Sequence, residues 1–197
     1  MGDVKMSSNV YKINEIFTSI QGEGSYCGHV ASFIRFSGCN QKCTYCDTPH
    51  EKGGEMTATE ICDALIPSAP LIVFTGGEPL LQLDTNLIEA LREVFPRSRL
   101  SLETNATIPV PWAFFKAGLN WVTQSPKTST FQKVRGELKL IYPNYNPKEF
   151  EGFKGAKYLQ PCMDKNYAEN LESTITYCLK NPQWSLSLQL QKIIGIK

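Results

Sequence analysis

The feature that most constrains this fold is a recurring order of short apolar runs and amphipathic segments. Residues 71–75 read LIVFT, a pattern typical of a strand that is covered on both faces. Similar strand-like runs occur at residues 30–36, 100–103, 121–124, 137–142, 157–160 and 184–190, and helical spacing occurs at residues 57–66, 84–95 and 167–179. Strands that alternate with helices indicate parallel βαβ units.

The number of these units limits the architecture further. A closed eight-stranded (β/α) barrel typically takes ~250 residues, whereas this chain has 197 residues. We therefore expect an α/β fold with about six mainly parallel strands and few helices, arranged as a partial, open (β/α) barrel. Residues 1–197 are expected to form a single domain.

Glycine and polar residues follow the predicted strands at the point where each strand ends. They include residues 38–46, residues 76–79, Thr104 with Asn105, and Ser125 with Lys127. In parallel α/β architectures, ligands bind beyond the carboxyl ends of the strands. These segments are therefore predicted to meet at one functional site.

Three cysteines within one such segment have metal-ligand spacing. Cys39, Cys43 and Cys46 form a C-x3-C-x2-C pattern, and cysteine thiolates are the usual ligands of a [4Fe–4S] cluster. Three protein ligands leave one position open for chemistry, as in a catalytic metal site. The alternative is structural zinc, which takes four ligands and could recruit His50. Cys62 and Cys178 lie in helical patterns and are expected in the core.

Charge and hydropathy exclude several classes of function. The chain has 20 Lys+Arg and 19 Asp+Glu, and this balance argues against a nucleic-acid partner. No apolar run approaches the ~18 residues of a membrane span, and the first residues contain no secretory apolar region. We therefore expect a cytoplasmic protein with no membrane partner.

The motifs together resemble a known family. The C-x3-C-x2-C loop after a first strand, followed by Gly76-Gly77-Glu78-Pro79 after the next, is similar to the radical S-adenosylmethionine (SAM) superfamily. Within it, the chain resembles the 7-carboxy-7-deazaguanine synthase family through the segments FTSIQGEG (17–24), GCNQKCTYCDT (38–48), ETN (103–105), SPK (125–127), ELK (137–139), QP (160–161) and LSLQ (186–189). A glycyl-radical activase is the rival enzyme class, but it gives no reason for the 17–24 segment.

The resemblance implies an activity and a set of partners. Members of the family convert 6-carboxy-5,6,7,8-tetrahydropterin into 7-carboxy-7-deazaguanine and release ammonia, in the biosynthesis of queuosine and related 7-deazapurines. They use a [4Fe–4S] cluster, SAM and Mg²⁺, form homodimers, and receive electrons from a donor such as flavodoxin. Each of these properties is an expectation for this chain.

The resemblance also implies site residues. The cluster would be held by Cys39, Cys43 and Cys46; SAM by Tyr45, Cys46, Asp47, Gly77, Glu78, Ser125, Pro126, Lys127 and Gln160; the pterin by Ile20, Gln21, Gly22, Glu23, Arg35 and Thr75; and Mg²⁺ by Thr48. Arg35 suits the substrate carboxylate because a guanidinium can bind it bidentately. Without the resemblance, Arg35 reads as a surface arginine, residues 21–24 as a turn, and Thr48 as a loop hydroxyl.

Two positions depart from the family pattern. Gln191 stands where a histidine is common near the end of the chain, and Cys162 lies within a Gln160–Asp164 segment that is longer than the usual form.

Overall fold

The computed structural model describes residues 9–197. The expectation that no secretory signal is present, and the first part of the expected 1–197 domain, fall on residues 1–8 and lie outside the described residues. Among residues 9–197, no helix is both long enough and apolar enough to cross a bilayer.

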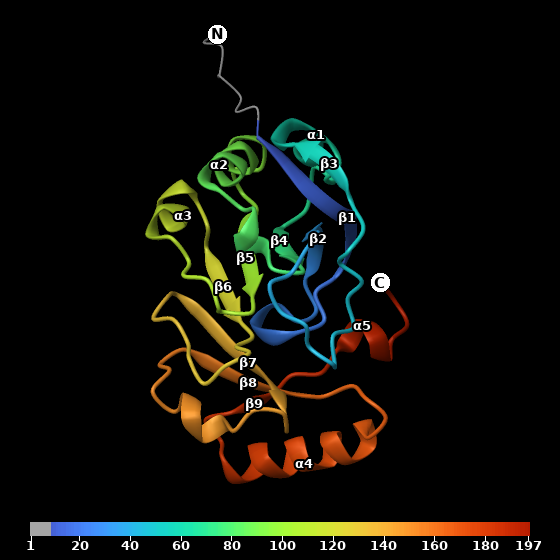
Figure 1. Cartoon of the computed structure of the whole chain (residues 1–197), viewed down its shortest axis with the longest axis vertical. Coiled ribbons are helices and arrows are strands. Elements are labelled where there is room, and N and C mark those ends of the chain that lie inside the picture. Colours follow the sequence, from blue (N-terminus) through green and yellow to red (C-terminus); the bar gives the residue numbers. More distant parts are fainter. Residues whose placement is uncertain (1–8) are drawn as a thin grey trace.

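Residues 9–197 build one nine-stranded sheet with the order β3-β1-β2-β4-β5-β6-β7-β8-β9 (Figure 1). The strands are β1 (Val10–Ile20), β2 (Val30–Phe36), β3 (Gly54–Thr57), β4 (Leu71–Gly76), β5 (Arg99–Thr104), β6 (Trp121–Gln124), β7 (Gly136–Tyr142), β8 (Ala156–Pro161) and β9 (Ser185–Leu186). Neighbouring strands in the series β2-β4-β5-β6-β7-β8-β9 pair in parallel, whereas β1 pairs antiparallel with both β2 and β3. Because β3 and β9 are free edges, the sheet is not closed, and the expected open barrel is confirmed.

The helices pack on the outer face of the sheet, except the last one, whose Gln191 and Lys192 face its inner side. They are α1 (Ala58–Asp63), α2 (Thr85–Val94), α3 (Trp112–Ala117), α4 (Tyr167–Lys180) and α5 (Leu190–Ile193), with short 3-10 turns η1 (Gly24–Tyr26), η2 (Pro79–Leu81) and η3 (Pro147–Phe150). The start of α1 is fixed by a capping box between Thr57 and Glu60, and α2 is capped by Asp84, which accepts from the Leu87 amide. Such caps satisfy amides that otherwise have no helical partner.

Period-two alternation sorts the strand residues between two faces. On β5, Leu100 and Leu102 are buried in the main core beneath α1, α2 and α3, and Glu103 lies on the opposite, inner face. On β7, Leu138 and Leu140 join a second core with η3 and residues of α4, while Lys139 faces inward. The inner faces of β5 and β7 therefore carry polar side chains, whereas those of β2 and β4 also carry a small apolar cluster of Ala31, Phe33, Leu71 and Val73.

Two parts of the sheet differ from the expectation. Strands β1 and β3 were not predicted, and residues 17–20 of the family-like segment 17–24 belong to β1. The 184–190 strand is reduced to Ser185–Leu186, because the chain then leaves the sheet: the Leu190 amide donates to the Gly22 carbonyl at 3.2 Å. Helix α1 also ends at Asp63 instead of continuing to residue 66.

Candidate active site

A cavity of about 420 Å³ lies inside the open barrel. Its wall includes all three cysteines of the C-x3-C-x2-C loop and most of the other predicted site residues: Ile20, Gln21, Gly22, Glu23, Arg35, Tyr45, Asp47, Thr48, Thr75, Gly77, Ser125, Lys127 and Gln160. Glu78 and Pro126 are not among the lining residues. The fold thus brings into one cavity residues that are spread from position 20 to position 160.

The floor of the cavity is built by the loop that joins β1 to β2. Because β1 runs antiparallel to β2, this loop lies at the amino ends of the parallel strands, opposite to the cysteine loop. Tyr26 packs against Trp121 at the start of β6 with 5.8 Å between ring centroids, and the Ser25 amide donates to Glu137 Oε2 at 2.9 Å. Residues 20–23, predicted to bind the substrate, thus lie at the opposite end from the predicted segments that follow the strands.

The cysteine loop lies at the other end of the cavity. Cys39, Cys43 and Cys46 are free thiols, and the Cys39 sulfur accepts from the Gln41 amide at 3.4 Å and from Asn105 Nδ2 at 3.9 Å. Within residues 9–197, no three His, Cys, Asp or Glu side chains are gathered into a preformed metal site. Three free thiols from one loop that line one cavity have the donor chemistry of a three-thiolate iron–sulfur centre. His50 lines the same cavity, with its Nδ1 buried and unbonded.

The glycine-rich segment after β4 is pressed against the cysteine loop. A Cβ at Gly77 would lie 1.8 Å from the Gly38 carbonyl oxygen, so only glycine fits. The fully buried Glu78 carboxylate accepts from Thr104 Oγ1 at 2.9 Å and from the Asn105 amide at 2.7 Å. Burial raises the pKa of Glu78. The Glu78 side chain therefore holds the loop after β5 in place, while the backbone at Gly77 faces the cavity.

One buried acceptor in the predicted SAM region has no partner within the described chain. Gln160 Oε1, at the end of β8, is buried without a hydrogen bond. Nearby functional groups are satisfied: Lys127 Nζ donates to Ser125 Oγ at 3.1 Å and lies 5.5 Å from the Tyr45 ring centroid. Burial lowers the pKa of Lys127. A buried free acceptor is costly, and it fits a ligand that donates hydrogen bonds, such as an ammonium or amino group.

The floor carries a buried ion pair. Lys139 is only 7% exposed and donates to the Glu23 carboxylate, which also accepts from Gln189 Nε2 and Gln191 Nε2 at 3.0 Å each. Burial alone would raise the pKa of Glu23, but the Lys139 charge and these donors bring it below its usual value. Burial would lower the pKa of Lys139, and the charges of Glu23 and Glu103 instead raise it. Both groups are thus held in their charged forms.

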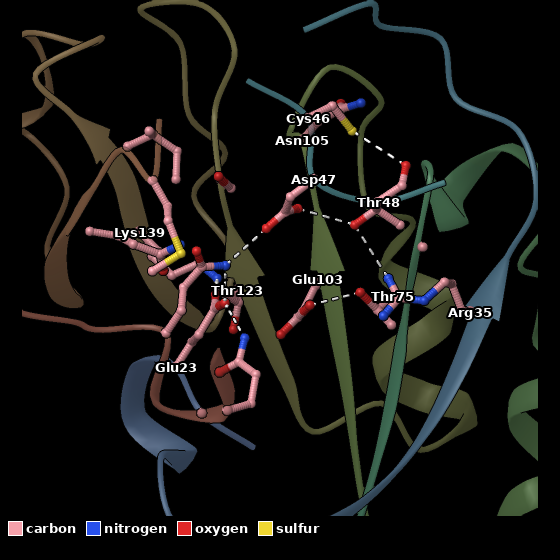
Figure 2. Close-up of a pocket in the computed structure, with 18 of the residues that line it drawn as sticks. Glu23, Arg35, Cys46, Asp47, Thr48, Thr75, Glu103, Asn105, Thr123 and Lys139 are labelled. Carbon is pink, nitrogen blue, oxygen red and sulfur yellow. Dashed lines mark hydrogen bonds and ion pairs between the residues drawn. The ribbon is translucent and has the colours of Figure 1, made fainter. Parts of the chain in front are cut away.

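Arg35 lies on the opposite wall of the cavity (Figure 2). Its Nε donates to Glu15 Oε1 at 2.8 Å, its Nη1 donates to Thr48 Oγ1 at 3.5 Å, and its guanidinium lies 5.6 Å from the Phe17 ring centroid. Thr48 Oγ1 in turn donates to Asp47 Oδ1 at 3.3 Å. Arg35 is therefore a positioned, half-buried cation beside the predicted Mg²⁺ residue, and not an isolated surface arginine.

Glu103 stands between these two walls and was not predicted as a site residue (Figure 2). Its Oε1 accepts from Gln21 Nε2 at 3.0 Å, and its Oε2 accepts from Thr75 Oγ1 at 2.8 Å. Two residues predicted to bind substrate therefore converge on one carboxylate. A carboxylate that accepts two donors side by side can also accept from the paired N–H groups of a planar heterocycle.

Other contributors were missed as well. Glu15, Lys139 and Gln189 touch predicted site residues, yet the sequence indicated no role for them. The available signal for Lys139 was the alternation of its strand: Leu138 and Leu140 face the core, so Glu137 and Lys139 share the inward face. Gln189 ends the family-like segment 186–189, but that match gave it no role, since its place in the site depends on the course of the chain after β9.

The chain is similar to proteins of one family. Residues 33–159 match the family model described as Radical SAM superfamily. The chain is 40% identical over 190 residues to a 7-carboxy-7-deazaguanine synthase of Bacteroides thetaiotaomicron, which covers 94% of this chain and 98% of that one. It is 37% identical over 215 residues to a protein of the same name from Bradyrhizobium diazoefficiens, which covers 95% and 99%. The fold resembles the crystal structure of QueE from Escherichia coli, with a TM-score of 0.69, 23% identity, and coverage of 92% and 94%.

Proposed function

We propose that this chain, which belongs to the 7-carboxy-7-deazaguanine synthase family of radical SAM enzymes, contracts the ring of 6-carboxy-5,6,7,8-tetrahydropterin and releases ammonia to give 7-carboxy-7-deazaguanine. The family expected from the sequence motifs is confirmed, and membership implies a [4Fe–4S] cluster and SAM. The exact substrate, the ammonia and the queuosine pathway are parts of the proposal.

The observation that carries the proposal is that the two ends of the cavity carry different functional groups. Its cysteine end has the thiols and the unpaired Gln160 acceptor that a cluster with SAM would use, and its floor has hydrogen-bonding groups suited to a guanine-like ring. One cavity that spans both ends can hold the two molecules at reacting distance.

Two groups would recognise the pterin. The N–H groups of its amino-amide edge match the two oxygens of Glu103, in place of the donors from Gln21 and Thr75. The carboxylate of the substrate would bind the Arg35 guanidinium, whose orientation is already set by Glu15. A charge-assisted bidentate contact of this kind is stronger and more selective than a neutral hydrogen bond.

Thr48 is the proposed Mg²⁺ ligand. Mg²⁺ characteristically takes few protein oxygens and completes its shell with water and substrate, which suits a single hydroxyl beside the Arg35 carboxylate site. The ion would then orient the substrate oxygens next to the guanidinium.

The division of chemistry follows from these positions. When bound, the cluster and SAM supply the one-electron chemistry that removes hydrogen from the substrate. The protein holds the ring on Glu103, fixes the carboxylate on Arg35, and shields the reacting atoms from solvent within the barrel. The proposal includes a cytoplasmic homodimer that receives electrons from a flavodoxin-type donor and acts as one domain over residues 1–197.

An anaerobic assay tests the proposal. The reconstituted enzyme is mixed with SAM, Mg²⁺, 6-carboxytetrahydropterin and dithionite, and the product is identified by mass spectrometry while ammonia is quantified. Formation of 7-carboxy-7-deazaguanine and ammonia in equal amounts is expected. SAM cleavage without consumption of the pterin would refute the substrate assignment.

A further inference from the structure

Gln189 joins the two ends of the cavity. It lies immediately before α5 and is 8% exposed. Its Nε2 donates to Glu23 Oε1 at 3.0 Å and to Asp47 Oδ2 at 3.1 Å. Glu23 belongs to the floor loop, whereas Asp47 directly follows Cys46 in the cysteine loop. One side-chain amide therefore links two loops that face different ligands.

The bridge is chemically complete. An amide nitrogen carries two N–H donors, and each of them meets a carboxylate oxygen. Lys192 Nζ donates to Gln189 Oε1 at 3.0 Å, which orients the amide, and also donates to Asp47. Lys139 neutralises Glu23 in the same way. Because each carboxylate has its own lysine, the two can share a neutral amide without strong mutual repulsion.

We propose that Gln189 is a positioning residue that couples the floor loop to the cysteine loop, so that a ligand bound at either end pre-orders the other end. The inference rests on the proposed function, because that function assigns the pterin to the floor and SAM to the cysteine end. A ligand that fixes Glu23 also fixes Asp47 through the bridge, and the second ligand then pays less to order its own site. Such coupling is reciprocal: the pterin and SAM must tighten each other by the same factor.

Gln191 offers a matched control. Its Nε2 also donates to Glu23 Oε1 at 3.0 Å, so its side-chain amide binds the floor loop and not Asp47. Gln191→Met therefore removes an amide from the same carboxylate and leaves the link to Asp47 in place. Gln189→Met, with a side chain of similar length and no amide, breaks the link itself.

The experiment measures binding without turnover. Cluster-loaded enzyme is titrated anaerobically, without reductant, with SAM in the presence and absence of saturating 6-carboxytetrahydropterin, and with the pterin in the presence and absence of SAM. In the wild type we expect a coupling factor of about fivefold or more, within the usual range for linked sites. Gln189→Met should reduce the factor to about one, whereas Gln191→Met should weaken pterin binding and keep the factor.

Several results would overturn the inference. They are an unchanged factor in Gln189→Met, an equal loss in both variants, or no coupling in a wild type that binds both ligands. A wild type that binds SAM but not the pterin would instead overturn the proposed function, and the inference with it. If Gln189→Met does not take up the cluster, Gln189→Asn decides the question, because its amide is one methylene too short to reach both carboxylates.

Discussion

Replacing Lys139 by methionine removes a buried cation that faces three carboxylates. Lys139 pairs with Glu23, and the charges of Glu103 and Glu137 also act on it. Breaking a buried pair by removing one partner costs about 3–5 kcal/mol. We expect the lower end, about 3 kcal/mol, because Gln189 and Gln191 still donate to Glu23. For a chain of this size, that corresponds to a fall in Tm of about 6–12 °C.

The sign of the pH dependence adds a second test. The pKa of Glu23 is below its usual value in the folded protein, so its pairing stabilises the fold above the unfolded pKa of about 4.3 and is lost as pH falls through the lower folded value. In Lys139→Met, burial without a cation should raise the pKa of Glu23, and the variant should gain stability as Glu23 becomes protonated. The difference in Tm should therefore be largest near neutral pH and shrink in acid.

Calorimetry of cluster-loaded protein at several pH values measures this effect, and the double variant Glu23→Gln/Lys139→Met is its control. The double variant removes both charges, so it should be more stable than Lys139→Met alone. A Lys139→Met protein that melts within about 2 °C of the wild type at neutral pH would show that the ion pair contributes little to the free energy of unfolding. A double variant less stable than Lys139→Met would contradict the argument that an unpaired Glu23 causes the loss.

Three further predictions concern the ligand sites. Cys39→Ala should abolish SAM cleavage, which is monitored by chromatography of the products, while Cys178→Ala should keep the visible absorbance of the cluster. Normal SAM cleavage by Cys39→Ala would show that Cys39 is not a cluster ligand. Arg35→Lys should raise the KM for the carboxylated pterin at least about tenfold, since about 1.4 kcal/mol is tenfold, and should leave binding of the decarboxylated analogue unchanged; equal weakening of both would remove Arg35 from carboxylate recognition. Gly77→Ala should lower the iron content per chain, because the new Cβ would displace Gly38 beside Cys39; full iron loading would show that the loop can yield.

The sequence predicted the elements whose signals are local. The run at 71–74 is apolar throughout and became most of β4, and the Thr57 and Glu60 capping box became the start of α1. Strand β1 escaped prediction because its alternation is interrupted: the pairing register shifts between Ile13 and Glu15, and a bulge breaks the period-two pattern by which strands are recognised.

The cavity was predictable only in part for a related reason. The cysteine ligands lie within eight residues of each other, so their spacing is visible in the sequence. Gln189 contacts Glu23 across 166 positions and Asp47 across 142 positions. Contacts of that span depend on how the sheet is ordered and where the chain turns after β9. Neither the propensity of Gln189 nor its neighbours carries that information.

The bulge in β1 has a consequence for insertions and deletions. Before it, Tyr11 and Ile13 pack into the core beneath the helices, whereas after it Phe17 packs on the cavity side, so odd-numbered residues change faces. A one-residue slip moves every side chain of a strand to the other face. The bulge absorbs one extra residue at Asn14, so loss of Asn14 alone would leave a regular strand whose side chains keep their faces. Loss of Lys12, in contrast, would force either the core residues or Glu15, the partner of Arg35, to the wrong side. The number of residues in β1, far in sequence from the cysteine loop, thereby determines which side chains face the cavity beside Arg35.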